Sequence, residues 1–166
     1  MRGISYKFGN DINTDLIISG RYKFSITDPN QLAGHIFEDI DPHFHKNLGK
    51  DKFFVAAGTN FGCGSSREQA PMALKYAGCR AVLAKSFARI FYRNAFNLGL
   101  PLIECDTGKI KKEDIIEVDI EKGIVAGPQK KYILHIKPFT RFQKDLIEIG
   151  GIVNYYKKYG GLKIEP

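Results

Sequence analysis

The middle of the chain alternates short apolar runs with segments of helical periodicity. Continuous apolar runs at residues 53–57, 80–85 and 100–105 predict buried strands. Between them, apolar residues at helical spacing predict one helix that ends at Gly78 and a second over residues 87–98. This order of strand, helix, strand, helix and strand predicts a three-stranded parallel sheet with right-handed crossovers, flanked by helices.

The second of these helices has a pronounced apolar stripe. We expect Ser86 to cap its N-terminus and Gly99 to end it. Arg89 and Arg93 fall together on another face. The residues expected to pack against the core are Phe87, Ile90, Phe91, Ala95 and Leu98.

The regions on either side of this unit predict further strands. Residues 4–8 alternate around Tyr6 and predict a first strand. Residues 115–120 and 124–126 predict a hairpin, and residues 132–136 a further strand, so that the tail forms a small β-rich annex.

Two more helices complete a single α/β domain over residues 1–166. Asp28 and Pro29 predict the start of a helix over residues 30–39. A last helix is expected from about residue 139, with a kink at the glycine pair 150–151. Its apolar face is predicted to contain Phe142, Leu146, Ile149, Val153 and Tyr156.

A dense run of glycine and polar residues at 58–68 separates the first predicted buried strand from the following helix. Its three glycines permit positive φ angles and close approach to a ligand. Ser65 and Ser66, followed by Glu68 and Gln69, predict a capping box at the start of the helix. The run is therefore expected to lie beyond the carboxyl end of its strand, where binding sites of parallel sheets occur.

The same run has the chemistry of an anion site. A helix N-terminus offers free N–H groups and a positive dipole end, and Arg67 adds a fork that binds a carboxylate or phosphate. A glycine-rich turn before a capped helix is the alternative interpretation. The run matches neither the Gly-x-Ser-x-Gly turn of serine hydrolases nor a Walker nucleotide loop.

Two other polar loops attract attention. In the loop at residues 9–15, Asp11 and Asp15 are candidates for an acid, a base or simple caps. Residues 19–28 lack periodicity and are interpreted as a functional loop. His43 and His45 are interpreted as surface residues, because no carboxylate or cysteine completes a metal-ligand set.

Composition narrows the functional classes. The chain has 166 residues, 43% of them hydrophobic, and a net charge of +7, which favours anionic ligands or an acidic partner. Its lysine clusters are short and scattered, which argues against nucleic-acid binding. Three widely spaced cysteines, no Cys-x-x-Cys and no apolar run long enough to span a bilayer indicate a soluble, cytoplasmic protein without a disulfide framework.

Three stretches together carry a family resemblance: residues 7–15, 60–68 and 85–95. With these, the chain resembles the small subunits of aconitase-type hydro-lyases, in particular those of 3-isopropylmalate dehydratase and archaeal homoaconitase. The resemblance implies a swivelling β/β/α domain that closes over a large subunit in a heterodimer or heterotetramer. It also implies a [4Fe-4S] cluster on that large subunit, with none bound by this chain and no metal ligand in it.

The resemblance also implies residue roles. Ser65 corresponds to the catalytic base, and Asp15 lines the same catalytic site. Ser66 and Arg67 correspond to residues that hold the carboxylates of a small dicarboxylate substrate. In the loop at 19–28, the implied substrate contacts are Arg21, Lys23 and Phe24.

The substrate expectation rests on that loop. Homoaconitase relatives place an arginine where this chain has Phe24, whose ring favours an isopropyl group and disfavours an unpaired carboxylate. The expected reaction is the interconversion of 2- and 3-isopropylmalate through 2-isopropylmaleate, in leucine biosynthesis. Homoaconitate remains an alternative substrate, because the ammonium of Lys23 can bind the carboxylate of a longer tricarboxylate. Methyl-substituted malates (citramalate, dimethylmalate) are close alternatives. An RNA- or anion-binding module is the alternative of another class.

Overall fold

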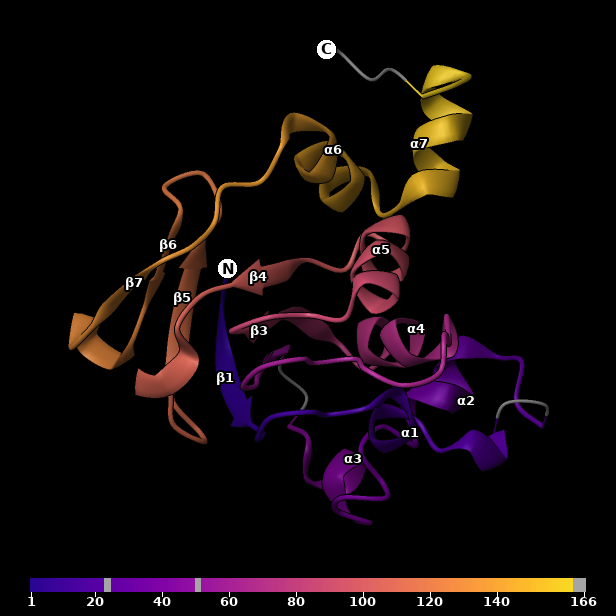
Figure 1. Ribbon diagram of the computed structural model, residues 1–166, viewed down its shortest axis with the longest axis horizontal. Helices are drawn as coiled ribbons and strands as arrows, with labels where there is room; N and C mark the ends of the chain where they lie inside the picture. The colour runs from indigo at the N-terminus through magenta and orange to yellow at the C-terminus, as the bar shows by residue number, and fades with distance from the viewer. Residues whose placement is uncertain (23–24, 50–51, 163–166) are drawn as a thin grey trace.

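All strands of the described structure join in one mixed sheet (Figure 1). The computed structural model describes residues 1–22, 25–49 and 52–162, and within these seven strands follow the order β4-β3-β2-β1-β5-β6-β7. The predicted α/β class is confirmed. The strands are β1 (Arg2–Lys7), β2 (Phe53–Ala56), β3 (Cys79–Ala84), β4 (Leu102–Glu104), β5 (Ile115–Asp119), β6 (Ile124–Ala126) and β7 (Ile133–His135).

Four strands, β1 to β4, form the parallel half of the sheet. β2, β3 and β4 were each predicted from a continuous apolar run, and they pair in parallel as expected. β1 adds a fourth parallel strand, with Ile4 opposite Phe53. The predicted three-stranded parallel sheet was therefore one strand too small, because no local pattern indicates which neighbour the first strand pairs with.

The antiparallel half, β5 to β7, continues the same sheet. β5 pairs antiparallel with β1, with Gly3 opposite Ile116, and the predicted hairpin of β5 and β6 is present. β7 then pairs with β6. The β-rich annex thus exists but is not separate, because its first strand uses the free edge of β1.

Helices cover one face of the parallel half, where α4 packs against α2, α1 and α5 (Figure 1). Their apolar side chains join those of alternate strand positions such as Val55 and Val82 in one core cluster. The helices are α1 (Thr14–Ile17), α2 (Pro29–Ala33), α3 (Phe44–Asn47), α4 (Gln69–Tyr76), α5 (Arg89–Asn97), α6 (Arg141–Ile149) and α7 (Ile152–Tyr159).

The opposite face of the parallel half packs against the antiparallel half. Phe54 and Leu83 of the parallel strands share a second apolar cluster with Ile116 and Val125 of the antiparallel strands. The sheet must curl over itself for these side chains to meet. Both faces of the parallel strands are therefore buried, which explains their unbroken apolar sequence.

The first predicted helix is shorter than expected. α2 begins at Pro29 with Asp28 as its cap, as predicted, but ends at Ala33 instead of residue 39. Phe37 has a positive φ of 56° and is buried, stacked on Phe8 with ring centroids 4.2 Å apart. Burial of this ring in the core outweighs continuation of the helix.

The predicted kink in the last helix is a complete break. Gly150 and Gly151 adopt φ angles of 86° and 122° and separate α6 from α7. The break changes which residues of α7 face inward: Tyr155 is 2% exposed, whereas Tyr156 is 58% exposed. The predicted apolar face is therefore wrong beyond the glycine pair.

Of the helices in the described ranges, none has the length and apolarity that a bilayer crossing requires.

Candidate functional site

The loops that follow β1, β2 and β3 meet at the carboxyl edge of the parallel strands. Gly62 N–H donates to the Ile12 carbonyl at 2.7 Å, which joins the first loop to the second. Phe61 N–H donates to the Ser86 carbonyl at 3.1 Å, which joins the second loop to the third. Three segments that are distant in sequence thus form one continuous polar surface.

Two glycines of the central loop are required by this packing. Gly62 has a φ of 79°, and a Cβ there would lie 2.2 Å from the ring of Phe91. A Cβ at Gly58 would lie 1.8 Å from Oδ1 of Asn10. Side chains at these positions would push the loops apart. The predicted positive φ is confirmed at Gly62 and Gly64 but not at Gly58, and close approach to a ligand stays a prediction.

Ser65 and Ser66 lie just before α4, as predicted, but they do not cap it. Glu68 occupies the N-cap position without a side-chain bond to the helix, so the predicted capping box is wrong. The Ser65 carbonyl instead accepts a hydrogen bond from Thr14 Oγ1 at 2.9 Å. Both serine side chains are exposed. Helix capping, which would have explained the two serines without a ligand, is therefore not their role.

Ser86 also has a role other than the predicted cap. Ala88 is the N-cap residue of α5, and Ser86 Oγ accepts from the Asn60 N–H at 2.9 Å. The hydroxyl group stabilises the junction between two loops of the site, because α5 begins later than the sequence pattern suggested.

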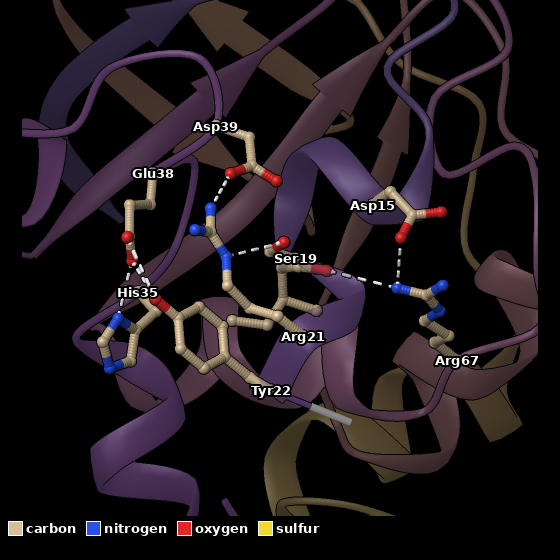
Figure 2. A network of polar contacts seen from close by, with 9 residues as sticks. Asp15, Ser19, Arg21, Tyr22, His35, Glu38, Asp39 and Arg67 are labelled. Carbon is tan, nitrogen blue, oxygen red and sulfur yellow. Dashed lines mark hydrogen bonds and ion pairs between the residues drawn. The ribbon is translucent and has the colours of Figure 1, made fainter. Parts of the chain in front are cut away.

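Arg67 forms an ion pair with Asp15, whose carboxylate lies 2.5 Å from Nη1 (Figure 2). The Arg67 side chain is only 13% exposed, whereas Asp15 is 51% exposed. Nη1 also lies 3.5 Å from the Ile18 carbonyl, and the buried Nε has no hydrogen-bond partner among the described residues. Asp15 is thus positioned to orient Arg67, and the guanidinium retains donors for an anionic ligand.

Asp15 and Asp11 separate into different roles. Asn13 is the cap of α1, where its side chain accepts from the Leu16 N–H at 2.9 Å. Asp15 is therefore not a cap, and it faces Arg67. Asp11 accepts from Asn60 Nδ2 at 2.8 Å and joins two loops.

Arg21 points away from Arg67 (Figure 2). Its guanidinium forms an ion pair with Asp39, and its Nε donates to Ser19 Oγ at 3.1 Å. A substrate role for Arg21 stays a prediction. Lys23 and Phe24 lie outside the described residues.

An open cleft of about 980 Å³ contains Ser65, Ser66 and Arg67. Its opposite walls come from α5 and from the segment leading into α6, including Phe139. Ile90 lines the cleft and is 46% exposed, so its predicted place in the packed stripe is wrong.

The exposure of Ile90 follows from the way α5 packs. Phe91, Ala95 and Phe96 are the residues of α5 that are buried. Phe91 and Ala95 of the predicted stripe are thus confirmed, whereas Ile90 lines the cleft together with Arg89 and Arg93. The sequence did indicate that α5 has a polar face, because it placed Arg89 and Arg93 together on one side of the helix.

No group of three His, Cys, Asp or Glu side chains in the described part of the chain is placed to hold a metal ion. Cys79 and Cys105 are buried, and burial raises the pKa of their thiols to about 12 and about 11. High thiol pKa values oppose the thiolate form that binds iron. Cys63 alone of the three is partly exposed. These residues do not fit an iron–sulfur cluster.

Comparisons with known proteins agree with this geometry. A family model of the aconitase C-terminal domain matches residues 14–108. The chain is 49% identical over 164 residues to 3-isopropylmalate dehydratase small subunit 2 of Archaeoglobus fulgidus, covering 99% of each chain. It is 46% identical over 158 residues to the methanogen homoaconitase small subunit of Methanocaldococcus jannaschii, covering 95% of this chain and 92% of that one.

A solved structure is also similar over nearly the whole chain. A crystal structure of 3-isopropylmalate dehydratase from Methanocaldococcus jannaschii superposes with a TM-score of 0.90 at 46% identity, covering 96% of this chain and 94% of that one. The curved mixed sheet and the loops at its carboxyl edge thus belong to a known architecture.

Proposed function

Because the chain belongs to the aconitase C-terminal domain family and is the small subunit of an aconitase-family hydro-lyase, we propose that it contributes the base and the carboxylate-binding groups of a 3-isopropylmalate dehydratase. The observation that carries this proposal is that Ser65, Ser66 and Arg67 line one open cleft, with Arg67 paired to Asp15. Within the residues that the structure describes, neither serine side chain caps α4, the structural role that would otherwise account for them.

In the proposed reaction, Ser65 Oγ removes a proton from the carbon beside a substrate carboxylate. The hydroxyl group on the neighbouring carbon leaves, and 2-isopropylmaleate results. Addition of water with the two positions exchanged converts 2-isopropylmalate to 3-isopropylmalate, so the overall reaction is an isomerisation without a change in oxidation state. This chemistry places the enzyme in leucine biosynthesis.

The surroundings of Ser65 support its proposed role as a base. A serine hydroxyl is a weak base unless nearby charges and dipoles stabilise its anion. α4 begins at Gln69, four residues after Ser65, and a helix N-terminus presents N–H groups that have no partner within the helix. Arg67, two residues after Ser65, contributes a guanidinium that is paired with Asp15. The same groups favour the negative charge that develops on the substrate when the proton leaves. Ser66 and Arg67 would hold the substrate carboxylates.

The iron–sulfur cluster is proposed to belong to the large subunit. The described residues of this chain do not fit such a cluster, and we propose that the large subunit supplies its Lewis-acid chemistry. Each step assigned to this chain concerns only Ser65, Ser66, Arg67 and Asp15.

We place the large subunit over the face of α5 that borders the cleft. Ile90 is a large apolar residue left exposed there, and it lies between the exposed Arg89 and Arg93. Neither arginine has an ion-pair partner in the ranges that the structure describes. Because this face continues directly from Ser65 and Arg67, a partner that completes the site must cover it. The matching surface of the large subunit would be apolar with an acidic rim.

For the substrate, isopropylmalate is proposed ahead of homoaconitate. Relatives of similar identity carry either name, so overall similarity does not separate the two. The identity of Phe24 supports the choice, since an aromatic ring suits an isopropyl group and leaves an added carboxylate unpaired. Lys23 is the residue that would support the longer tricarboxylate.

Reconstitution with the cognate large subunit tests the proposal. The chain is co-purified from its native cell or co-expressed, iron and labile sulfide are assayed, and kcat/KM is measured on isopropylmalate, homoaconitate and citramalate. The expected result is activity only in the pair, with a preference for isopropylmalate that Phe24→Arg weakens. A preference for homoaconitate that Lys23→Ala removes would overturn the substrate assignment. Turnover by the chain alone without iron would overturn the role as a small subunit.

A further inference from the structure

Two polar clusters lie at opposite ends of the short segment 18–22 (Figure 2). At one end is the ion pair of Asp15 and Arg67. At the other end Tyr22 meets His35 and Glu38, which come from the turns after α2. The backbone between them is a single helical turn, Gly20–Tyr22. Only the backbone of residues 18–22 therefore separates Tyr22 from the Ile18 carbonyl that contacts Arg67.

Tyr22 is anchored by both a hydrogen bond and ring stacking. Its hydroxyl donates to Glu38 Oε2 at 2.8 Å and lies 3.0 Å from Oε1. Nδ1 of His35 is 2.6 Å from the same Oε2. The rings of Tyr22 and His35 stack with their centroids 4.0 Å apart. Glu38 thus holds two partners at once, and the hydrogen bonds from His35 and Tyr22 lower the pKa of its carboxyl group.

The other end of the segment touches the guanidinium of Arg67. The Ile18 carbonyl lies 3.5 Å from Nη1. A Cβ on Gly20 would lie 3.0 Å from Asp15 Oδ1 and 3.2 Å from Arg67 Nη2, so the backbone passes close against the ion pair. A second ion pair, which is partly exposed, joins Arg21 beside Tyr22 to Asp39. The backbone of the segment 18–22 therefore packs against the side chain of Arg67.

We propose that Glu38 is a positioning residue, which holds Tyr22 and through the segment 18–22 keeps Arg67 in the orientation that binds a substrate carboxylate. This proposal rests on the proposed function of Arg67. Glu38 itself does not touch the substrate, because its carboxylate is occupied by Tyr22 and His35. Loss of the anchor leaves Ser65 in place, since the Ser65 loop is held separately by Thr14. The effect is therefore expected in KM and not in kcat.

The first test uses the full chain alone, with hydrogen exchange of the backbone amides of residues 18–22 followed by mass spectrometry. Glu38→Ala should speed exchange in this segment about tenfold, because Tyr22 loses its hydrogen bond to Glu38. Glu38→Gln retains an acceptor for Tyr22 and should restore part of the protection. The matched control is Glu148→Ala, which removes an exposed carboxylate from α6. Unchanged exchange in Glu38→Ala would refute the anchor whatever the enzyme proves to do.

The second test uses the reconstituted pair of subunits. Glu38→Ala and Tyr22→Phe should each raise KM about tenfold with little change in kcat, and the double variant should be no worse than either single variant. Additive effects, an unchanged KM, or a fall in kcat alone would overturn the positioning role. If the wild-type pair turns over none of the substrates while Glu38→Ala still loosens the segment, the proposed function fails and the anchor stands.

Discussion

The parallel and antiparallel halves of the sheet use the same backbone hydrogen bonding but keep their polar residues in different places. Three strands of the parallel half end at one edge, where the loops after them begin. Ser65 and Arg67 lie in one of these loops, and Asp15 lies in α1, which follows another. In the antiparallel half, β5 has an alternating pattern of buried and exposed residues, and its hairpin turns toward solvent. The buried side chains of the antiparallel half complete the core beneath the parallel strands.

This difference between the two halves shows why the candidate site residues lie at the edge of the parallel half. Parallel strands need long crossovers, and the loops that begin them gather at one edge of the sheet. Hairpins return at once and leave no such gathering of loops. Substitutions in the loops of the parallel half should therefore affect catalysis, assembly or loop packing, whereas substitutions in the exposed turns of the antiparallel half should affect stability alone and only slightly.

The largest expected effect is that of Ser65→Ala. Removal of a general base should lower kcat of the reconstituted pair by between about 10²- and 10⁴-fold. The melting temperature should not change, because the exposed side chain does not cap α4. Turnover and thermal unfolding of the same preparation check this. Near-normal turnover would exclude Ser65 as the base, and a large fall in melting temperature would assign the serine a structural role.

A matched pair of glycine substitutions compares the two halves directly. Gly62→Ala should destabilise the chain by roughly 2 to 5 kcal/mol, because a positive φ and a clash with Phe91 combine. Gly123→Ala, in the hairpin of the antiparallel half, should cost only about 1 to 2 kcal/mol, because its φ of 66° is unfavourable but the surrounding space is open. Urea unfolding measures both. Equal losses would show that packing of the site loops imposes no special constraint.

Arg67→Lys should raise KM by about 10- to 100-fold while kcat falls less, since an ammonium group replaces a planar fork. Steady-state kinetics of the pair measure this split. A useful comparison is Arg67→Lys combined with Asp15→Asn, which tests whether Asp15 acts through Arg67. If KM stays unchanged in Arg67→Lys, the substrate carboxylate binds elsewhere in the cleft.

Two double variants with the same net charge test where the large subunit binds. The double variant Arg89→Glu with Arg93→Glu should weaken binding of the large subunit by at least about tenfold, because it reverses the charge of the α5 face. The double variant Lys130→Glu with Lys131→Glu makes the same change of charge in the antiparallel half and should leave assembly intact. Titration by calorimetry or light scattering distinguishes them. Equal weakening by both variants would attribute assembly to net charge alone.

The smallest expected effect is that of Thr140→Ala at the start of α6. Thr140 Oγ1 accepts from the Gln143 N–H at 3.2 Å, and the Gln143 side chain accepts in turn from the Thr140 N–H. Loss of this capping box should cost about 1 kcal/mol of stability and leave kcat/KM unchanged. A fall in kcat/KM larger than the loss of stability explains would mean that the cap also shapes the nearby cleft.

Local patterns predicted the parts of the fold that depend on neighbouring residues. The apolar runs of β2, β3 and β4, the cap at Asp28 and the hairpin of β5 and β6 were all recovered. The position of the glycine and serine run before α4 was recovered as well. These features arise from periodicity, turn chemistry and chain direction, which can be deduced over a few residues.

The errors arose where a distant contact outweighed a local preference. The chain does not continue as a helix through Phe37, whose ring packs on Phe8 in the core, and Ser86 links two loops because Asn60 lies beside it. Ile90 faces the cleft because α5 packs through Phe91 and Phe96 instead. None of these contacts is visible in a short window of sequence.

The sequence by itself determined the chemical groups of this protein: a serine pair, an arginine and an aspartate in two polar loops, within a chain rich enough in apolar runs to form a mixed sheet. Only the tertiary structure decided that Asp15 pairs with Arg67, that Arg21 turns to Asp39, and that Glu38 anchors Tyr22. The physical reason is that strand order sets which loops become neighbours. Strand order depends on pairing between segments far apart in the chain, which no local pattern encodes.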